Sequence, residues 1–212
     1  MNENMCGKPS EVEHYFTPRP RSKPEFKLIN AYLRGKRFQF LTSKSVFSKN
    51  RVDLGTRILV ENMILPEKGY VLDIGCGYGV IGIVAAALNP NIHVVMVDVN
   101  KRAVNLAKHN IKINGVNNAE ARHGSLYDPV RGMTFECILS NPPISAGLAT
   151  VRAIVTEAPK YLSNGGVLQI VVRSKIGKER FTQMLKEAFG NFTVLARESG
   201  YRVLIAEKKS AS

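Results

Sequence analysis

The chain has 212 residues, 44% of them hydrophobic and 22% charged, values that are typical of a folded globular protein and exclude a disordered one. It contains no apolar run of about 18 residues and no apolar leader at its N-terminus, so we expect a cytoplasmic protein without a membrane span. The net charge of +13 favours a polyanionic partner such as a nucleic acid. Three cysteines and four histidines show no metal-ligand spacing, and we expect no metal.

The first 52 residues are predicted to form a basic extension that packs on the rest of the chain. Ten Lys or Arg and one acid, Glu25, lie between Arg19 and Arg51, interleaved with aromatic residues. Cations beside aromatic rings suit phosphate contact and base stacking, although a generally basic solvated surface is the simpler alternative. Within this extension we expect a short helix over residues 24–33, a strand over 37–42 and a further short strand over 46–48.

Residues 53–207 are predicted to form one α/β domain, and residues 208–212 a frayed tail. Strands alternate with helices, which indicates a doubly wound, mostly parallel sheet. The short link at Gly200 can only join two antiparallel strands, so a hairpin closes the sheet. The expected strands cover residues 70–74, 92–98, 118–123, 135–139, 167–172, 192–197 and 201–206. The expected helices cover residues 54–63, with Asp53 as N-cap, and then 79–88, 101–113, 148–162 and 177–189.

A glycine turn follows the first strand of this domain and predicts a nucleotide-type ligand site. Asp73 ends the strand, and the three alternating glycines Gly75, Gly77 and Gly79 lead into an apolar helix. Such glycines allow positive φ and close approach of the backbone to a ligand. The spacing to Gly82 also fits the dinucleotide fingerprint, so a nicotinamide or flavin enzyme stays an alternative. The carboxylate of Asp73 would repel a pyrophosphate but suits a cationic amino group.

A second acid, Asp98, ends the next strand, 19 residues after Gly79. An acid near this spacing commonly holds ribose hydroxyls, which supports a nucleoside ligand. The simpler alternative is that Asp73 and Asp98 only cap helices. Two acids at successive strand ends, with the glycines between them, favour the ligand site.

The motif Asn141-Pro142-Pro143 follows the fourth strand and predicts transfer chemistry at an amine. An Asn side-chain oxygen and the Pro142 carbonyl could accept both hydrogens of an exocyclic amine and direct its lone pair at an electrophile. An isolated Asn-Pro turn is the alternative. Because the ends of parallel strands share one edge of a sheet, Asn141 is expected in the same cleft as the glycine turn and Asp98.

These motifs together resemble class I S-adenosylmethionine (SAM) methyltransferases that act on amines. More closely, the chain resembles the small-domain family related to ribosomal RNA small-subunit guanine-N2 methyltransferases, in a compact archaeal form. The resemblance extends over about residues 14–207 and implies the seven-stranded Rossmann-like methyltransferase fold. The segments that carry it are His14–Phe16, Leu33–Gly35, Val46–Ser48, Asp53–Thr56, Asp73–Gly82, Ser140–Ile144 and Gly200–Arg202.

The resemblance also implies roles for single residues. The residues implied for SAM are Asp73, Gly75, Gly77 and Gly79 at the methionine end, Asp98 at the ribose, Val99 and Asn100 near the adenine, and Phe47 and Thr56 closing over the cofactor. Asn141 and Pro142 are implied as catalytic, Pro143 and Ile144 as contacts of the target base, and Arg34, Lys36 and Arg37 as contacts of the nucleic-acid backbone. Two positions depart from the usual pattern. Ser125 and the Leu126 backbone stand where many relatives carry an acid for the adenine, and Ile144 stands where many carry an aromatic residue.

We therefore expect a SAM-dependent methyltransferase that acts on guanine N2 of ribosomal RNA, as a monomer or weak dimer. Protein glutamine, tRNA and DNA amines stay open as alternative substrates. A non-catalytic RNA-binding protein with a vestigial cofactor site is a further alternative, and a dehydrogenase a distant one.

Overall fold

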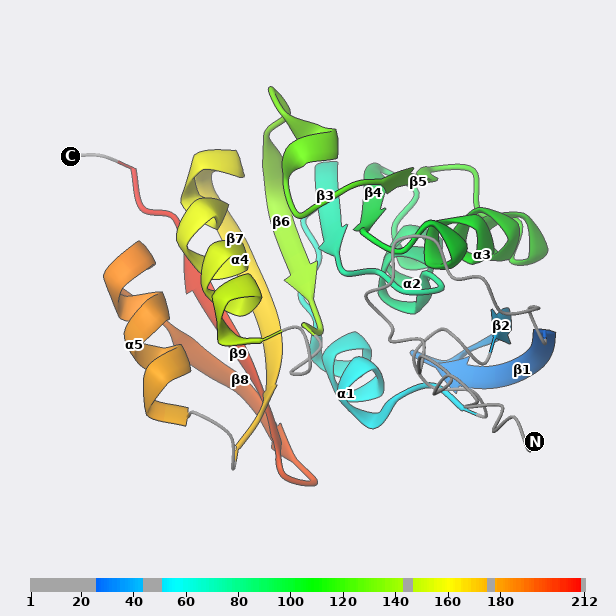
Figure 1. The fold of residues 1–212 in the computed structure, drawn as a ribbon, viewed down its shortest axis with the longest axis horizontal. Coiled ribbons are helices and arrows are strands. Elements are labelled where there is room, and N and C mark those ends of the chain that lie inside the picture. The colour runs from blue at the N-terminus through cyan, green and yellow to red at the C-terminus, as the bar shows by residue number, and fades with distance from the viewer. Residues whose placement is uncertain (1–25, 44–50, 143–146, 175–177, 211–212) are drawn as a thin grey trace, which may run out of the picture.

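The structure is a computed structural model that describes residues 26–43, 51–142, 147–174 and 178–210. Its centre is a seven-stranded sheet with the order β5-β4-β3-β6-β7-β9-β8 (Figure 1). Neighbours from β5 to β7 pair in parallel, and β9 pairs antiparallel with both β7 and β8. The strands are β3 (Gly69–Ile74), β4 (Ile92–Asp98), β5 (Ala119–His123), β6 (Phe135–Ser140), β7 (Leu162–Arg173), β8 (Thr193–Glu198) and β9 (Tyr201–Glu207). The predicted doubly wound sheet with its closing hairpin is confirmed.

Helices cover both faces of this sheet, which explains why its central strands read as continuous apolar runs. The helices are α1 (Leu54–Asn62), α2 (Val80–Leu88), α3 (Lys101–Ile113), α4 (Leu148–Tyr161) and α5 (Lys178–Phe189), with a 3-10 turn at Asp128–Val130. Alternate strand residues divide between two cores. Val71 and Val94 pack with α1, α2 and α3, whereas Leu72 and Val95 pack with α4 and α5.

The N-terminal extension differs from its prediction, because residues 26–33 form a strand and not a helix. β1 (Phe26–Leu33) and β2 (Lys36–Ser43) make an antiparallel hairpin beside α3, at the end of the molecule far from α5 (Figure 1). Arg34 and Gly35 both have positive φ, 49° and 77°, which is the geometry of a two-residue hairpin turn. The predicted helix over residues 24–33 is therefore wrong, and Gly35 lies in the turn of a hairpin. The predicted strand at residues 46–48 lies outside the described residues.

Two asparagines of α3 attach the hairpin to the domain. The side-chain amide of Asn110 accepts from Leu41 N at 2.7 Å and donates to Leu41 O at 3.0 Å. Asn114, one helical turn later, makes the same pair of bonds with Gln39, at 3.0 and 2.7 Å. Asn110 also donates to Tyr78 O in the glycine turn, at 2.8 Å. One buried side chain thus joins the extension to the predicted ligand site.

The C-terminal elements also depart from their predicted bounds. β7 begins at residue 162, before the Gly165-Gly166 turn, and not at residue 167. Lys208 exchanges backbone hydrogen bonds of 2.8 Å with Gly165 and Gly166, so it is fixed and not frayed.

Candidate active site

The glycine turn lies at the carboxyl end of β3 and requires glycine at each alternate position. Gly75, Gly77 and Gly79 have φ of 71°, 56° and 94°, a region that side chains with a Cβ avoid. Gly79 is also the N-cap of α2. Gly82 meets a different constraint, because a Cβ there would lie 2.5 Å from Met96 Cγ on β4. Glycine therefore lets the first turn of α2 approach the strand ends closely.

Asp73 is fully buried beneath this turn and keeps an unused acceptor. Its Oδ2 accepts from Gly82 N at 3.0 Å, whereas Oδ1 has no hydrogen-bond partner among the described residues. Burial raises the pKa of Asp73 to about 7; the charge of Asp98 raises it further, and the Gly82 N–H opposes the shift. A buried acceptor without a donor is costly, and a ligand ammonium group would satisfy it.

Asp98, at the end of β4, organises the neighbouring loops. Its Oδ2 accepts from Gly77 N at 2.9 Å and its Oδ1 from Asn100 N at 2.8 Å, while its backbone carbonyl accepts from Gly124 N. A carboxylate offers about four acceptor sites, and ribose hydroxyls are groups from which it can accept. The cap alternative fits Asp73 alone, which accepts from Gly82 N in the first turn of α2, because Asp98 holds loop N–H groups and Asn100 caps α3.

The loops after β4 and β5 meet next to Asp98. His123 Nε2 lies 3.0 Å from Val99 O, and the buried side chain of Asn100 caps α3. Ser125 is exposed, and Leu126 is half-buried with φ of 46°. The structure therefore brings the predicted ribose and adenine residues to one edge of the sheet.

Asn141 follows β6, and its side chain is held by the start of α1. Its Nδ2 donates to Asp53 Oδ2 at 2.9 Å and to Thr56 Oγ1 at 2.8 Å. Asp53 also accepts from Thr56 N at 3.2 Å, as the predicted N-cap. Both amide hydrogens are thus used, and Asn141 Oδ1 remains as an acceptor. The structure places Thr56 against this amide.

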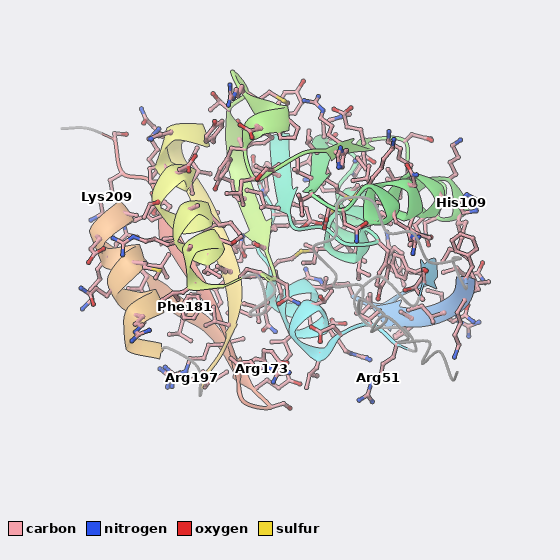
Figure 2. The ribbon with its side chains drawn as sticks, viewed as in Figure 1. Arg51, His109, Arg173, Phe181, Arg197 and Lys209 are labelled. Atoms are coloured by element: carbon pink, nitrogen blue, oxygen red, sulfur yellow. The ribbon has the colours of Figure 1, made fainter. Side chains whose placement is uncertain are left out.

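Gly55 and Tyr201 lie beside Asn141, although neither was assigned a role at the site from the sequence. A Cβ at Gly55 would lie 3.0 Å from Tyr201 Cε1 and 3.3 Å from Asn141 Oδ1, so all three meet closely. The Tyr201 hydroxyl accepts from Arg173 Nε at 2.9 Å, and the guanidinium carbon lies 5.4 Å from the ring centroid. Figure 2 shows the exposed Arg173 at the edge of the molecule, near Arg197. The Gly200–Arg202 segment, which carries part of the family resemblance, was the sequence signal that could have assigned Tyr201 to the site. Asp53 was predicted only as a helix cap, and it also accepts a hydrogen bond from Asn141.

The remaining predicted site residues lie in different surroundings. Arg34 donates to the Glu61 carbonyl at 2.9 Å and Lys36 Nζ to the Ala87 carbonyl at 2.9 Å, so both bind the ends of helices. Arg37 is exposed. Pro142 is buried next to Asn141. Phe47, Pro143 and Ile144 lie outside the described residues.

Two kinds of feature are absent from the described part of the chain. No three His, Cys, Asp or Glu side chains there are placed to hold a metal ion. No helix there combines the length and apolar character needed to cross a bilayer.

Comparison with known proteins places these motifs in a family context. The model of the methyltransferase small domain matches residues 37–205. The Bacillus subtilis protein YbxB is 37% identical over 198 residues, 92% of this chain and 98% of its own, so the compact length also occurs in a bacterium. A ribosomal RNA small subunit methyltransferase C from Hamiltonella defensa is 31% identical over 189 residues, 86% of this chain and 55% of its own.

A solved structure adds a ligand-bound comparison. The T. thermophilus 16S rRNA N2-guanine methyltransferase, in complex with AdoMet and guanosine, superposes with a TM-score of 0.78 at 26% identity. The match covers 90% of this chain and 52% of that one. The chain therefore spans about half the length of these ribosomal RNA relatives.

Proposed function

This chain belongs to the methyltransferase small domain family, and we propose that it methylates the exocyclic N2 amine of a guanine in ribosomal RNA. Its membership makes it a SAM-dependent methyltransferase. The choice of guanine N2 and of ribosomal RNA is the proposal, and it is supported by the activities named for the relatives and by the site.

The residues at the ends of β3 and β4 fit SAM. When bound, SAM supplies an electrophilic methyl group on a sulfonium. The unpartnered Asp73 Oδ1 offers an acceptor for a ligand ammonium, and the glycine turn leaves room for close approach. Asp98 is the acceptor for the ribose, and Val99, Asn100, Ser125 and Leu126 border the adenine side.

The orientation of the Asn141 amide carries the proposal of an amine substrate. Because Asp53 and Thr56 take both amide hydrogens, Oδ1 is directed away from them and can accept an N–H from the target. An exocyclic amine is a poor nucleophile, since its lone pair is delocalised into the ring. Hydrogen bonds to Asn141 Oδ1 and the Pro142 carbonyl would favour a tetrahedral nitrogen. The nitrogen would then accept the methyl group as the S–C bond of the sulfonium breaks, with S-adenosylhomocysteine as the leaving group and the displaced N–H proton released to solvent.

Access to such a site requires an unpaired or flipped guanine. Arg173 is exposed and donates to the hydroxyl of Tyr201, whose ring lies near Gly55, and from there it can meet a phosphate of the same strand. The net charge of +13 supports RNA over a protein glutamine as the substrate.

The proposal is tested with tritiated SAM and unmodified ribosomal RNA, transfer RNA and ribosomal subunits, followed by digestion to nucleosides. Wild type should label N2-methylguanosine in a ribosomal fraction, and Asn141→Ala should lose the label. Asn164→Ala, an exposed asparagine on β7, is the matched control and should keep it. No label in any RNA, with SAM binding intact, would overturn the proposal and direct the search to protein glutamine.

A further inference from the structure

The β1–β2 hairpin has an outward face with large exposed side chains, and packing against the domain does not explain them. Its inward face is buried and includes Phe38 and Phe40. On the outward face Phe26, Leu28 and Tyr32 are 55%, 48% and 60% exposed. Large exposed apolar and aromatic side chains gathered on one face commonly mark a binding surface.

The strand register arranges this outward face in cross-strand pairs. Tyr32 lies opposite Arg37, and Asn30 lies opposite Gln39. Gln39 Nε2 donates to Asn30 Oδ1 at 3.1 Å, which orients both amides and leaves Asn30 Nδ2 and Gln39 Oε1 for a ligand. No described residue accepts a hydrogen bond from the Arg37 side chain. Successive outward residues on a strand lie about 6.8 Å apart.

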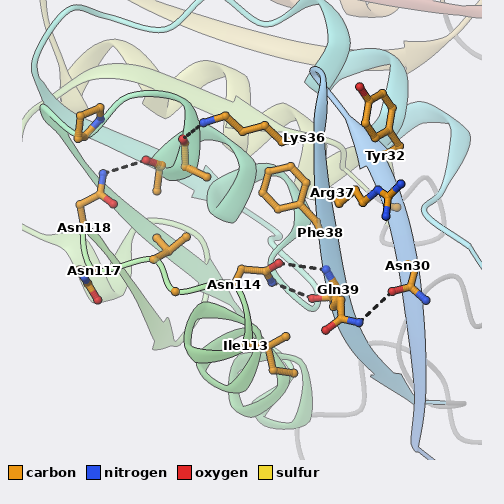
Figure 3. A pocket seen from close by; sticks show the side chains of 16 residues that line it. Asn30, Tyr32, Lys36, Arg37, Phe38, Gln39, Ile113, Asn114, Asn117 and Asn118 are labelled. Atoms are coloured by element: carbon orange, nitrogen blue, oxygen red, sulfur yellow. Dashed lines mark hydrogen bonds between the residues drawn. The ribbon is translucent and has the colours of Figure 1, made fainter.

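The same pairs border a groove between the hairpin and the domain (Figure 3). Its volume is about 1330 Å³, larger than the roughly 300–1,000 Å³ of a small-molecule pocket, and this size suits a segment of a polymer. The far wall is the end of α2 and residues 113–118, which include the side chain of Asn117. None of the described residues that line it is acidic.

Positive charge continues from the groove along α3 toward the cofactor edge. Residues 26–43 and 99–119 contain eight Lys or Arg and no Asp or Glu. Lys101, Lys108 and Lys112 are exposed on α3, and Figure 2 shows His109 at its outer end beside the hairpin. α3 begins next to Asp98 and ends at the groove, which over 13 residues is a span of about 20 Å.

We propose that the outward hairpin face and this groove form a second RNA-binding site, remote from Asn141, that stacks unpaired bases on Tyr32 and Arg37 and hydrogen-bonds them through Asn30, Gln39 and Asn117. This inference rests on the proposal that RNA is the substrate. Aromatic rings and guanidinium planes stack on bases of any sequence, and side-chain amides contact their edges. A face with basic residues and no acids suits a polyanionic strand better than a basic ribosomal protein.

The test measures the binding of a fluorescein-labelled, unstructured 12-nucleotide RNA by anisotropy at 50 and 150 mM salt. The double variant Tyr32→Ala/Arg37→Glu should bind roughly tenfold or more weakly, because it loses the stacking on both side chains and reverses one positive charge. Its affinity for SAM and its melting temperature should match wild type. Tyr70→Ala/Lys160→Glu removes an exposed tyrosine and reverses an exposed charge elsewhere, and it should bind RNA like wild type.

Equal RNA affinity of the groove variant and wild type would overturn the inference. A loss of the same size with poly-glutamate as probe would also overturn it, because the face would then be a general polyanion surface without base stacking. Failure of the proposed function is read separately. If the groove variant loses RNA affinity while wild type labels no guanosine, the RNA-binding groove is supported and the proposed guanine-N2 reaction is overturned.

Discussion

The side-chain nitrogen of Asn141 lies 2.9 Å from Asp53 Oδ2, although 88 residues separate them in the chain. The carboxylate and the Thr56 hydroxyl together take both hydrogens of the amide. The start of α1 therefore determines which way the Asn141 oxygen faces.

Removing this support should slow methyl transfer without weakening SAM binding. Loss of one hydrogen-bond partner of an oriented amide costs about 1–2 kcal/mol, so Asp53→Ala should lower kcat roughly tenfold. It should also lower the free energy of unfolding by about 1 kcal/mol through loss of the N-cap. Asp53→Asn keeps an acceptor for the amide and should retain most of the activity. If Asp53→Ala lowers SAM affinity and leaves kcat unchanged, Asp53 acts at the cofactor and not on Asn141.

The affinity for SAM should depend on pH through Asp73. Only the carboxylate form attracts an ammonium, and burial raises the pKa of Asp73 to about 7. Affinity should therefore rise by roughly tenfold between pH 5.5 and 7, a range in which an α-amino group stays protonated. Calorimetry on wild type and Asp73→Asn tests this, since the variant should show a flat profile. The same slope in both proteins would remove Asp73 from the ammonium site.

The ligand-free protein should lose stability as pH rises from about 4 to about 7. The folded carboxyl of Asp73 holds its proton up to about pH 7, whereas the unfolded one releases it near 3.8, so the unfolded state binds fewer protons in this window. The difference in pKa corresponds to at most roughly 4 kcal/mol. Urea unfolding at pH 4.5 and 7.5 should show this decline in wild type. Asp73→Asn should show a smaller one, and equal declines would contradict the assignment.

Gly82→Ala should destabilise the protein, because its Cβ would lie 2.5 Å from Met96 Cγ and Met96 is fully buried. Overpacking of this kind costs about 1–3 kcal/mol, and it should move α2 away from Asp73 and weaken SAM binding. Met96→Val in the same chain makes room and should restore part of both. Thermal unfolding and calorimetry measure the two effects. A fully stable single variant would show that α2 and β4 are not in close contact.

Asn110→Ala should detach the hairpin from the glycine turn. The substitution removes hydrogen bonds to Leu41 N, Leu41 O and Tyr78 O from a fully buried position, which should cost about 2–4 kcal/mol. Hydrogen exchange should rise at Leu41 and in the turn. Asn105→Ala, at an exposed position on the same helix, should change neither. Unchanged exchange at Leu41 would show that the hairpin is held by its apolar face alone.

Most of the domain was predictable, because the central strands β3, β4 and β6 are short apolar runs and many turns carry glycine, proline or a capping residue. The segment 26–33 was not. FKLINAYL holds apolar residues at spacings that fit a helix and a strand, and the choice depends on the register with β2. The Arg34-Gly35 turn is the local signal that was misjudged.

The site was predictable where one motif carries the chemistry, as at Asp73, Asp98 and Asn141. The partners of these residues come from distant segments. Nothing local to Asp53 shows that it accepts from Asn141, and nothing local to Tyr201 shows that its ring lies near Gly55. Nothing local to Asn110 shows that its amide reaches Leu41. Such contacts depend on how α1, α3 and β9 pack, and the residue pattern of one segment does not contain that information.

The side-chain amides of Asn110 and Asn114 also protect the edge of β2. A strand at the margin of a sheet normally offers free N–H and C=O groups to which a foreign strand can pair. On the edge of β2 that faces away from β1, the backbone N–H and C=O groups of Gln39 and Leu41 are already hydrogen-bonded to these side chains. Helix α3 therefore lies where a further strand would pair. The chain thus closes that margin of its hairpin to strand exchange and edge-to-edge aggregation, while the face of the same hairpin stays open to solvent.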